Sequence, residues 1–382
     1  MQRRHYDEDH LAFGDAVRTF IAKEMQPDYL AWEAAGLAPR ELFRAAGGNG
    51  FLGLQVPEQY GGGGTTDFRF NQILGEELML AGVGGAGLGI TLHNDICLPY
   101  FLNYCTEEQK QRWLPGIASG ELITAVAMTE PGAGSDLAGI RTSAVADSDD
   151  LIVNGAKTFI TNGINADLVI TAVRTGPERH KGLSLVIVER GMPGFERGRN
   201  LEKLGLHSQD TAELSFTDVR VPKANILGEI GAGFLGLVSN LPQERMSIAI
   251  SGVAGARAAL NWTISYVRER KAFGQSIGAL QNTRFVLAEI ATEVDVAQAY
   301  IDQCVDALLV GDLSPEDAAK AKWWATELQG RAVDRCLQLH GGYGYMQEYP
   351  IARAYADARV TRIYGGATEI MKEIIGKSLK LG

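Results

Sequence analysis

The stretch FVLAEIATEVDVAQAYIDQCVDALL, residues 285–309, decides the fold of the second half of the chain. Its apolar residues recur at steps of three or four, which places them on one face of a helix: Val286, Ile290, Val294, Ala297, Ile301, Cys304 and Leu308. Gly311 ends this helix, and Ser314-Pro315-Glu316-Asp317 supplies an N-cap, a proline and two acids for the next. We therefore expect long amphipathic helices joined by short turns, which is typical of a bundle.

The rest of the chain divides into two further segments. Phe13, Val17 and Phe20 share one helical face near the N-terminus. In the middle, Ala212, Leu214 and Phe216 alternate with polar residues as in a half-buried strand, and Asn154-Gly155 is typical of a hairpin turn. Short strands with no helical pattern between them favour a small barrel or a sandwich over a parallel sheet. We predict a helical N-terminal domain (1–122), a β domain (123–228) and a C-terminal helical bundle (232–382), in which Pro242 lies in the first turn of a helix.

Composition excludes several classes of protein. The 382 residues include 36 Lys and Arg against 46 Asp and Glu, a net charge of −10, which argues against a nucleic-acid partner. No run of about 18 apolar residues is present, so we expect no membrane span. The N-terminus lacks the apolar core of a secretory signal, and we expect a cytoplasmic protein. The cysteines form no CxxC pair and the histidines no HExxH motif, so we expect no metal.

Two glycine-rich stretches match GxGxxG, at residues 82–87 and 231–236. A dinucleotide-binding turn needs a strand before it and a helix opening within it. The first stretch follows a helical pattern and the second follows an isolated turn. We therefore do not predict a Rossmann domain.

Four other stretches contain residue types suited to a cofactor, and each also has a purely structural interpretation. Residues 125–136 (AVAMTEPGAGSD) are a strand and a Gly/Ser-rich turn whose N–H groups can hold an anion or a heterocycle edge, or a plain connection. Residues 157–163 (KTFITNG) offer an aromatic ring and a hydroxyl to a planar cofactor, or a core phenylalanine. Residues 269–274 (ERKAFG) place Arg270 for a pyrophosphate, or for a helix C-terminus. Residues 338–345 (QLHGGYGY) allow close approach of a ligand, or simple C-capping.

Together and in this order, these stretches resemble the acyl-CoA dehydrogenase family, and the resemblance covers essentially the whole chain. MTEPGAGSD (128–136) and RERKAFG (268–274) are similar to the two signature stretches of that family. The long-chain branch looks nearest, because of LPQER (241–245), YGYMQEYP (343–350) and IYGGATEIMKE (363–373).

The resemblance implies a mainly α fold: a helical N-terminal domain, a small β-barrel and a C-terminal four-helix bundle. It implies non-covalent FAD between barrel and bundle, a homotetramer in which FAD also touches a second subunit, and an electron-transferring flavoprotein as electron acceptor. The implied reaction is α,β-dehydrogenation of a fatty acyl-CoA to the trans-2-enoyl-CoA. A base removes the α-proton and a hydride leaves Cβ for flavin N5.

The position of the base departs from much of the family. Many members carry a catalytic Glu in the segment matching residues 363–366, where this chain has Gly365. The isovaleryl and long-chain branches place it at the position matching Glu244, so the resemblance implies that Glu244 is the base and that Gly365 leaves room for it. The structural alternative is an acid stabilised by the dipole of a helix's first turn. Arg245 is similar to the residue that binds the CoA portion, or is a surface cation.

The remaining site residues follow from the same resemblance. FAD would contact the following residues: Val126, Met128, Thr129, Ser135, Phe159, Ile160, Thr161, Arg270, Phe273, Gln281, Gln338, Leu339, Gly341, Gly342, Thr368 and Glu369. Arg270, Phe273, Gln281 and the stretch 338–342 would act from the neighbouring subunit. The substrate would contact Ser135, Arg245, Gly365 and Gly366, and the acyl tail would lie among N-terminal helices near Ile90 and His93.

Two alternative functions stay open at this point. An acyl-CoA oxidase or a flavin monooxygenase on the same fold would pass electrons to oxygen. A non-catalytic scaffold that binds FAD or acyl-CoA is suggested by Gly365, and Glu244 argues against it.

Overall fold

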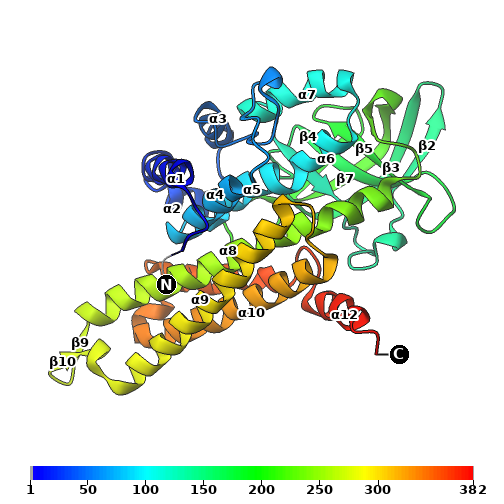
Figure 1. Cartoon of the computed structure of the whole chain (residues 1–382). Coiled ribbons are helices and arrows are strands. Elements are labelled where there is room, and N and C mark those ends of the chain that lie inside the picture. Colours follow the sequence, from blue (N-terminus) through cyan, green and yellow to red (C-terminus); the bar gives the residue numbers. More distant parts are fainter. Residues whose placement is uncertain (1–2, 382) are drawn as a thin grey trace.

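Helices form both ends of the chain and strands form its middle (Figure 1). The computed structural model describes residues 3–381. The N-terminal elements are α1 (Glu8–Phe20), the π-helix η1 (Ile21–Met25), α2 (Tyr29–Ala35), α3 (Arg40–Gly48), η2 (Glu58–Tyr60), α4 (Arg69–Leu80), α5 (Gly84–Thr91), the π-helix η3 (Leu92–Cys97), α6 (Leu98–Tyr104) and α7 (Glu107–Ser119). Val17 and Phe20 are buried in their core, as the periodicity predicts.

The middle segment is one eight-stranded sheet, in the order β6-β7-β3-β2-β4-β5-β8, with β1 paired to β4. Its elements are β1 (Thr124–Ala127), η4 (Leu137–Gly139), β2 (Ser143–Asp147), β3 (Asp150–Thr161), β4 (Leu168–Arg174), β5 (Leu183–Glu189), β6 (Phe195–Asn200), β7 (Thr211–Pro222), η5 (Lys223–Asn225) and β8 (Ile226–Leu227). Most pairs are antiparallel, while β1 and β4 run parallel. Ala212, Leu214 and Phe216 are buried, which confirms the predicted alternation.

The hairpin predicted at Asn154-Gly155 is wrong. Both residues lie inside β3, and the turn between β2 and β3 falls at Ser148, which has φ +54°. Gly155 instead sits at a register shift, where a Cβ would come within 2.6 Å of Thr142 Oγ1. The glycine therefore permits a close approach of two strands rather than a turn.

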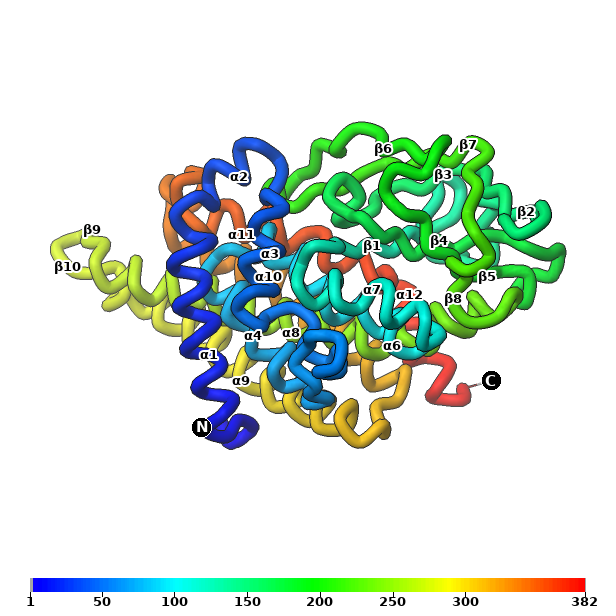
Figure 2. Tube along the Cα trace, turned by 90° about the horizontal axis from the view of Figure 1, so that it is seen from above, coloured from blue at the N-terminus to red at the C-terminus, as the bar shows by residue number. Residues whose placement is uncertain are grey.

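The C-terminal segment is a set of long helices that pack against one another and extend away from the sheet (Figure 1; Figure 2 shows them from above). Its elements are α8 (Gly233–Glu269), β9 (Lys271–Ala272), β10 (Gln275–Ser276), η6 (Ile277–Ala279), α9 (Gln281–Leu309), α10 (Pro315–His340), η7 (Gly341–Tyr345), α11 (Pro350–Ala358), η8 (Arg359–Arg362) and α12 (Thr368–Ser378). Ile290, Val294, Ala297, Ile301 and Cys304 of the predicted face are buried in one core with α8 and α10. The Ser314 side chain accepts from Asp317 N, as the predicted N-cap requires.

The predicted fold class is confirmed, with one error in a helix boundary. Pro242 does not lie in a first turn, because α8 begins at Gly233 and continues through the proline to Glu269. Glu244 is therefore about three turns inside the helix, too far from its N-terminus to gain from the dipole. Among residues 3–381, the longest apolar helical stretch falls short of what a bilayer crossing requires.

Candidate active site

Glu244 is a buried carboxylate held by neutral donors. Glu244 is 5% exposed. It lies on the face of α8 that packs against η3 and α6. The Tyr100 hydroxyl donates to Glu244 Oε1 at 2.9 Å, and Asn240 Nδ2 donates to the same oxygen at 3.0 Å. The alternative of an acid in the first turn of a helix is wrong, because Glu244 lies about three turns inside α8.

Burial raises the pKa of Glu244 to about 7. The hydrogen bonds from Tyr100 and Asn240 and the positive charge of Arg245 act in the opposite direction and only partly compensate. A carboxyl with a pKa near neutrality is partly ionised at working pH and can both accept and return a proton. The arrangement thus suits a general base.

Gly365 packs directly against the same face of α8. A Cβ at position 365 would lie 2.2 Å from Cδ1 of Ile248, which is one helical turn beyond Glu244. Gly365 also has φ +61°, and Gly366 has φ +100°. A side chain at position 365 would therefore require a strained backbone and a shift of the Ile248 side chain.

Two buried cations flank this glycine turn. Lys322 on α10 is fully buried, and its Nζ donates to Gly366 O at 2.6 Å. Arg245 is 5% exposed, and its Nε is buried without a hydrogen-bond partner among residues 3–381. Burial lowers the pKa of both groups, and that of Lys322 falls to about 8. The alternative of Arg245 as a surface cation is therefore wrong.

A second buried glutamate holds the Gly/Ser-rich turn in shape. Glu130 accepts from Lys157 Nζ at 2.9 Å and from the N–H groups of Arg141 and Thr142 at 2.7 and 2.8 Å. Lys157 Nζ also donates to Met128 O at 3.1 Å. These bonds hold the connection over residues 128–134, in which Gly132 and Gly134 face open space.

Residues predicted to contact the flavin ring gather beside this turn. Thr158 N donates to Thr129 O at 2.9 Å, which joins β3 to the end of β1. Phe159 sits in a β-bulge with φ +61° and is 65% exposed, so its ring projects from the sheet. Ile160 is buried in the sheet core, and only its backbone can meet a ligand. Val126 and Met128 pack against the same core as Tyr100, the residue that donates to Glu244.

A third set of predicted residues lies elsewhere in this chain. The exposed Arg270 follows α8 and Phe273 occupies the β9–β10 hairpin, at the far tip of the long helices (Figure 1). Phe273 is 91% exposed, and the Arg270 guanidinium lies 5.4 Å from the centre of the Tyr343 ring. The exposed Gln281 begins α9, and the stretch from Gln338 to Gly342 ends α10 at the same tip. The structure does not bring this set together with Glu244 within one chain.

The last predicted pair follows the glycine turn. Thr368 begins α12, and its hydroxyl donates to Glu327 Oε1 at 3.3 Å, while Glu369 is exposed. Ser135 is also exposed, in the turn after Glu130.

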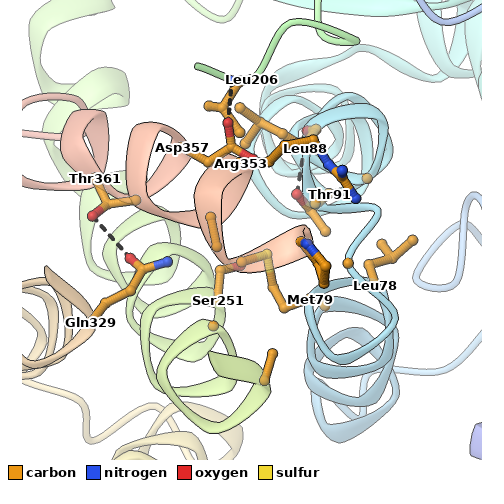
Figure 3. Close-up of a pocket in the computed structure, with 18 of the residues that line it drawn as sticks. Leu78, Met79, Leu88, Thr91, Leu206, Ser251, Gln329, Arg353, Asp357 and Thr361 are labelled. Atoms are coloured by element: carbon orange, nitrogen blue, oxygen red, sulfur yellow. Dashed lines mark hydrogen bonds between the residues drawn. The ribbon is translucent and has the colours of Figure 1, made fainter. Parts of the chain in front are cut away.

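A cleft opens two helical turns from Glu244 along α8 (Figure 3). Its lining includes Leu78, Leu88, Thr91, Ser251, Trp262 and Tyr364. Ser251 lies seven residues after Glu244, which places both on one face of the helix, and Tyr364 precedes Gly365. The cleft therefore adjoins the Glu244 region and is largely apolar near α4 and α5.

The position of the acyl tail near Ile90 and His93 stays a prediction. Both residues are fully buried. His93 Nε2 lies 3.0 Å from Ile117 O, its Nδ1 accepts from Thr124 N at 3.2 Å, and burial lowers its pKa to about 4. His93 is thus a satisfied core residue, and the neighbouring Leu88 and Thr91 line the cleft instead.

Sequence reasoning missed Tyr100, Asn240 and Lys322. Asn240 precedes Glu244 by four residues, a spacing that makes neighbours on a helix. That signal was hidden because the helix was predicted to begin at Pro242. Tyr100 and Lys322 reach the site from other helices, and no local pattern indicates such a contact.

Three family models match the chain in succession. They are described as the N-terminal domain of acyl-CoA dehydrogenase over residues 7–121, the middle domain over 125–219 and the C-terminal domain over 231–380. The chain belongs to the acyl-CoA dehydrogenase family. As an acyl-CoA dehydrogenase family member it is an oxidoreductase, and its cofactor is the family's FAD.

Relatives and solved structures cover nearly the whole chain. The long-chain specific acyl-CoA dehydrogenase of mitochondria from Sus scrofa is 46% identical over 380 residues, which are 99% of this chain and 88% of that protein. The crystal structure of acyl-CoA dehydrogenase from Geobacillus kaustophilus has a TM-score of 0.97 and 49% identity, with 100% of both chains covered. A glutaryl-CoA dehydrogenase from Mycobacterium smegmatis, in complex with FADH2, has a TM-score of 0.92 and 28% identity, with 98% of this chain and 95% of that chain covered.

The described residues fit FAD. The exposed ring of Phe159 offers a face for a planar heterocycle, and the open glycines of the Glu130 turn leave its backbone accessible. At the far tip, Gly341 and Gly342 also face open space beside the Arg270 guanidinium, which suits a phosphate group.

Proposed function

We propose that this enzyme dehydrogenates a fatty acyl-CoA thioester between Cα and Cβ to give the trans-2-enoyl-CoA, with Glu244 as the base. The observation that carries the proposal is the Glu244 carboxyl itself, which is buried, held only by neutral donors and shifted to a pKa of about 7. Gly365 supports it, because the chain has no carboxylate at that position and a side chain there would strain the backbone and displace Ile248.

The chain's own residues divide the work of the proton transfer. An α-proton next to a thioester is weakly acidic, so its removal requires a base in a dry pocket and polarisation of the carbonyl. Glu244 takes this proton, and the backbone of Gly365 and Gly366 contacts the thioester. Lys322 holds the glycine turn through Gly366 O. The unpartnered Arg245 Nε is available to an oxygen of the CoA portion.

FAD, when bound, supplies at flavin N5 the acceptor for the hydride that leaves Cβ. Val126, Met128, Thr129 and Ser135 would hold one side of the ring and Phe159, Ile160 and Thr161 the other, with Thr368 and Glu369 after the glycine turn. We assign Arg270, Phe273, Gln281, Gln338, Leu339, Gly341 and Gly342 to the FAD of a neighbouring subunit. Arg270 follows Glu244 by 26 residues along α8, or about 39 Å of helix, and this separation supports the assignment and a homotetramer. Electrons then pass to an electron-transferring flavoprotein.

We assign the acyl tail to the cleft beyond Glu244. The cleft has an apolar wall near α4 and α5, and its volume of about 50 Å³ means that lining side chains must move before a long chain can enter. Ser251→Phe would fill the cleft and leave Glu244 unchanged. We expect kcat/KM to fall about 10- to 200-fold for a long-chain acyl-CoA and to change little for butyryl-CoA, measured over a series of chain lengths. An equal fall for every chain length would refute this assignment.

The reaction is tested by anaerobic titration of the purified flavoprotein with acyl-CoA. We expect the flavin absorbance to bleach and to recover when oxidised electron-transferring flavoprotein is added. Glu244→Gln is expected to keep FAD and acyl-CoA binding and to bleach at least about 10³-fold more slowly. Near-normal bleaching by that variant would place the base elsewhere, and rapid reoxidation by oxygen with peroxide release would indicate an oxidase.

A further inference from the structure

The two hydrogen bonds at Glu244 converge on one of its two oxygens. Tyr100 Oη and Asn240 Nδ2 both donate to Oε1, at 2.9 and 3.0 Å. No donor among residues 3–381 makes a hydrogen bond to Oε2. Tyr100 is fully buried and Asn240 is 8% exposed, so water does not compete for these bonds.

Both donors are themselves fixed. Asn240 Nδ2 also donates to Ile96 O at 3.0 Å, so each of its two amide hydrogens has an acceptor and the amide cannot turn over. The Tyr100 ring packs among buried residues of the N-terminal helices, with Tyr104 at 6.2 Å between ring centres. The donors therefore keep their positions when the substrate arrives.

The π-helix η3 joins the two helices that carry these donors. Gln243 Nε2 donates to Asp95 O at 2.8 Å, and the Ser247 hydroxyl donates to the Asp95 carboxylate at 2.5 Å. Asn71 Nδ2 donates to the other Asp95 oxygen at 2.7 Å. Asn240, Gln243 and Ser247 flank Glu244 on α8, so the irregular backbone of η3 is tied to α8 on both sides of the base. π-Helical turns of this kind are frequent at functional sites.

We propose that Tyr100 and Asn240 are positioning residues that hold Oε1 of Glu244, so that Oε2 is the oxygen that takes the substrate proton. The proposal rests on the proposed function. A carboxylate has two oxygens with about four acceptor positions, and two donors on Oε1 leave the lone pairs of Oε2 free. One oxygen thus anchors the base, while the other has no hydrogen bond from the described residues and is free to accept the substrate proton.

The charges around Glu244 make this arrangement measurable. The titratable or charged groups that face it are Tyr100 on α6, Cys97 on η3 and Arg245 on α8. Burial raises the pKa of both Tyr100 and Cys97 far above neutrality, so neither titrates near pH 7. Asp95 on η3, which accepts from Ser247, also has its pKa raised by burial to about 7. Its signal is told apart from that of Glu244 because it persists in Glu244→Gln. A donor to the ionised form lowers the pKa of a carboxyl, and removal of the donor raises it.

Tyr100→Phe removes one donor and keeps the ring. We expect the acidic limb of the pH profile of kcat/KM to move upward by about one unit, because the ionised base loses a hydrogen bond. At pH 6 the rate should fall about tenfold relative to the unmodified enzyme, while at pH 9, where Glu244 is ionised in both, it should stay within about threefold. Asn240→Ala should give a shift in the same direction, and Tyr104→Phe, in the neighbouring ring, should give none.

Infrared titration of the Glu244 carboxyl gives a readout that does not need turnover. The protonated C=O band is identified by its absence in Glu244→Gln, and its midpoint should rise in Tyr100→Phe as the kinetic limb does. An unchanged midpoint and an unchanged acidic limb in both Tyr100→Phe and Asn240→Ala would overturn the proposal. If acyl-CoA does not bleach the flavin of the unmodified enzyme, the proposed function is overturned instead. The infrared titration would still show whether Tyr100 and Asn240 lower the pKa of Glu244.

Discussion

Glu130 and Glu244 are both buried glutamates, yet their surroundings shift their pKa values in opposite directions. Glu130 faces a buried ammonium, Lys157 Nζ at 2.9 Å, and two backbone N–H groups. These partners outweigh burial and keep the pKa of Glu130 below its usual value. Glu244 has only a phenol and an amide as hydrogen-bond donors, and burial raises its pKa to about 7.

The comparison shows how a single residue type serves either structure or chemistry. A carboxylate paired with a cation and satisfied by backbone donors stays ionised and stabilises a turn. A buried carboxylate with only neutral donors destabilises the fold while it is ionised, because its charge is poorly solvated. This destabilisation disappears when the carboxyl accepts a proton. Glu130 thus shapes the Gly/Ser-rich turn, and Glu244 is poised to take a proton.

Removing the cation should make Glu130 resemble Glu244. Lys157→Met leaves a buried carboxylate without its charged partner, and we expect a loss of about 3–5 kcal/mol in the free energy of unfolding at pH 8. The loss should shrink at pH 5, because the carboxyl then binds a proton. Chemical denaturation followed by flavin fluorescence measures both values. The double variant Lys157→Met/Glu130→Gln should recover much of the loss, and a double variant as unstable as the single one would contradict this account.

Replacing Glu244 with a neutral residue should stabilise the protein at neutral and alkaline pH, where the Glu244 carboxyl is ionised, and should have no effect at acidic pH. The pKa of Glu244 rises from 4.5 to about 7 on folding, so the folded state binds more protons between these values and becomes less stable as the pH rises through them. Glu244→Gln removes this cost, and we expect it to be more stable than the unmodified enzyme by about 2–3 kcal/mol at pH 8.

The same variant is its own control at pH 4, where the unmodified carboxyl is also neutral. There we expect the two proteins to unfold at the same denaturant concentration. A stabilisation that does not depend on pH would mean that the charge of Glu244 is not its origin.

The glycines of the two regions should respond differently to a methyl group. Gly365→Ala brings a Cβ within 2.2 Å of Ile248 Cδ1 at φ +61°, and we expect a cost of about 1–3 kcal/mol with a fall in kcat. Gly132→Ala, in the Glu130 turn, meets no atom within 4 Å, and we expect a change within about 0.5 kcal/mol. Ile248→Ala should relieve part of the Gly365→Ala defect. Thermal unfolding is compared for the unmodified enzyme, Gly365→Ala, Gly132→Ala and the double variant Gly365→Ala/Ile248→Ala. Equal losses of stability in Gly365→Ala and Gly132→Ala would contradict this account.

The sequence predicts most of the fold because its signals are local. The steps of three and four from Val286 to Leu308 and the cap at Ser314 each require only neighbouring residues, and both are confirmed. Pro242 misled the prediction, since tertiary packing along α8 outweighs the local cost of a proline in a helix. Asn154-Gly155 misled it in a similar way, because a β-bulge uses a glycine as readily as a turn does.

The site is less accessible to local reasoning. The resemblance to a family pointed to Glu244, but a carboxyl's pKa depends on every helix that packs against it. Tyr100 lies 144 residues before Glu244 in the chain, and Lys322 contacts Gly366 from another helix. Such contacts follow from the packed structure, and no spacing in the sequence indicates them.

The continuity of α8 has a consequence for how this enzyme can vary. The helix carries Glu244 near one end and leads into Arg270 at the other. A single inserted or deleted residue between them would rotate one end against the other by about 100° and shift it by about 1.5 Å. The length of α8 therefore fixes the position of Arg270 relative to Glu244. Substitutions along the helix keep that relation, whereas insertions and deletions change it.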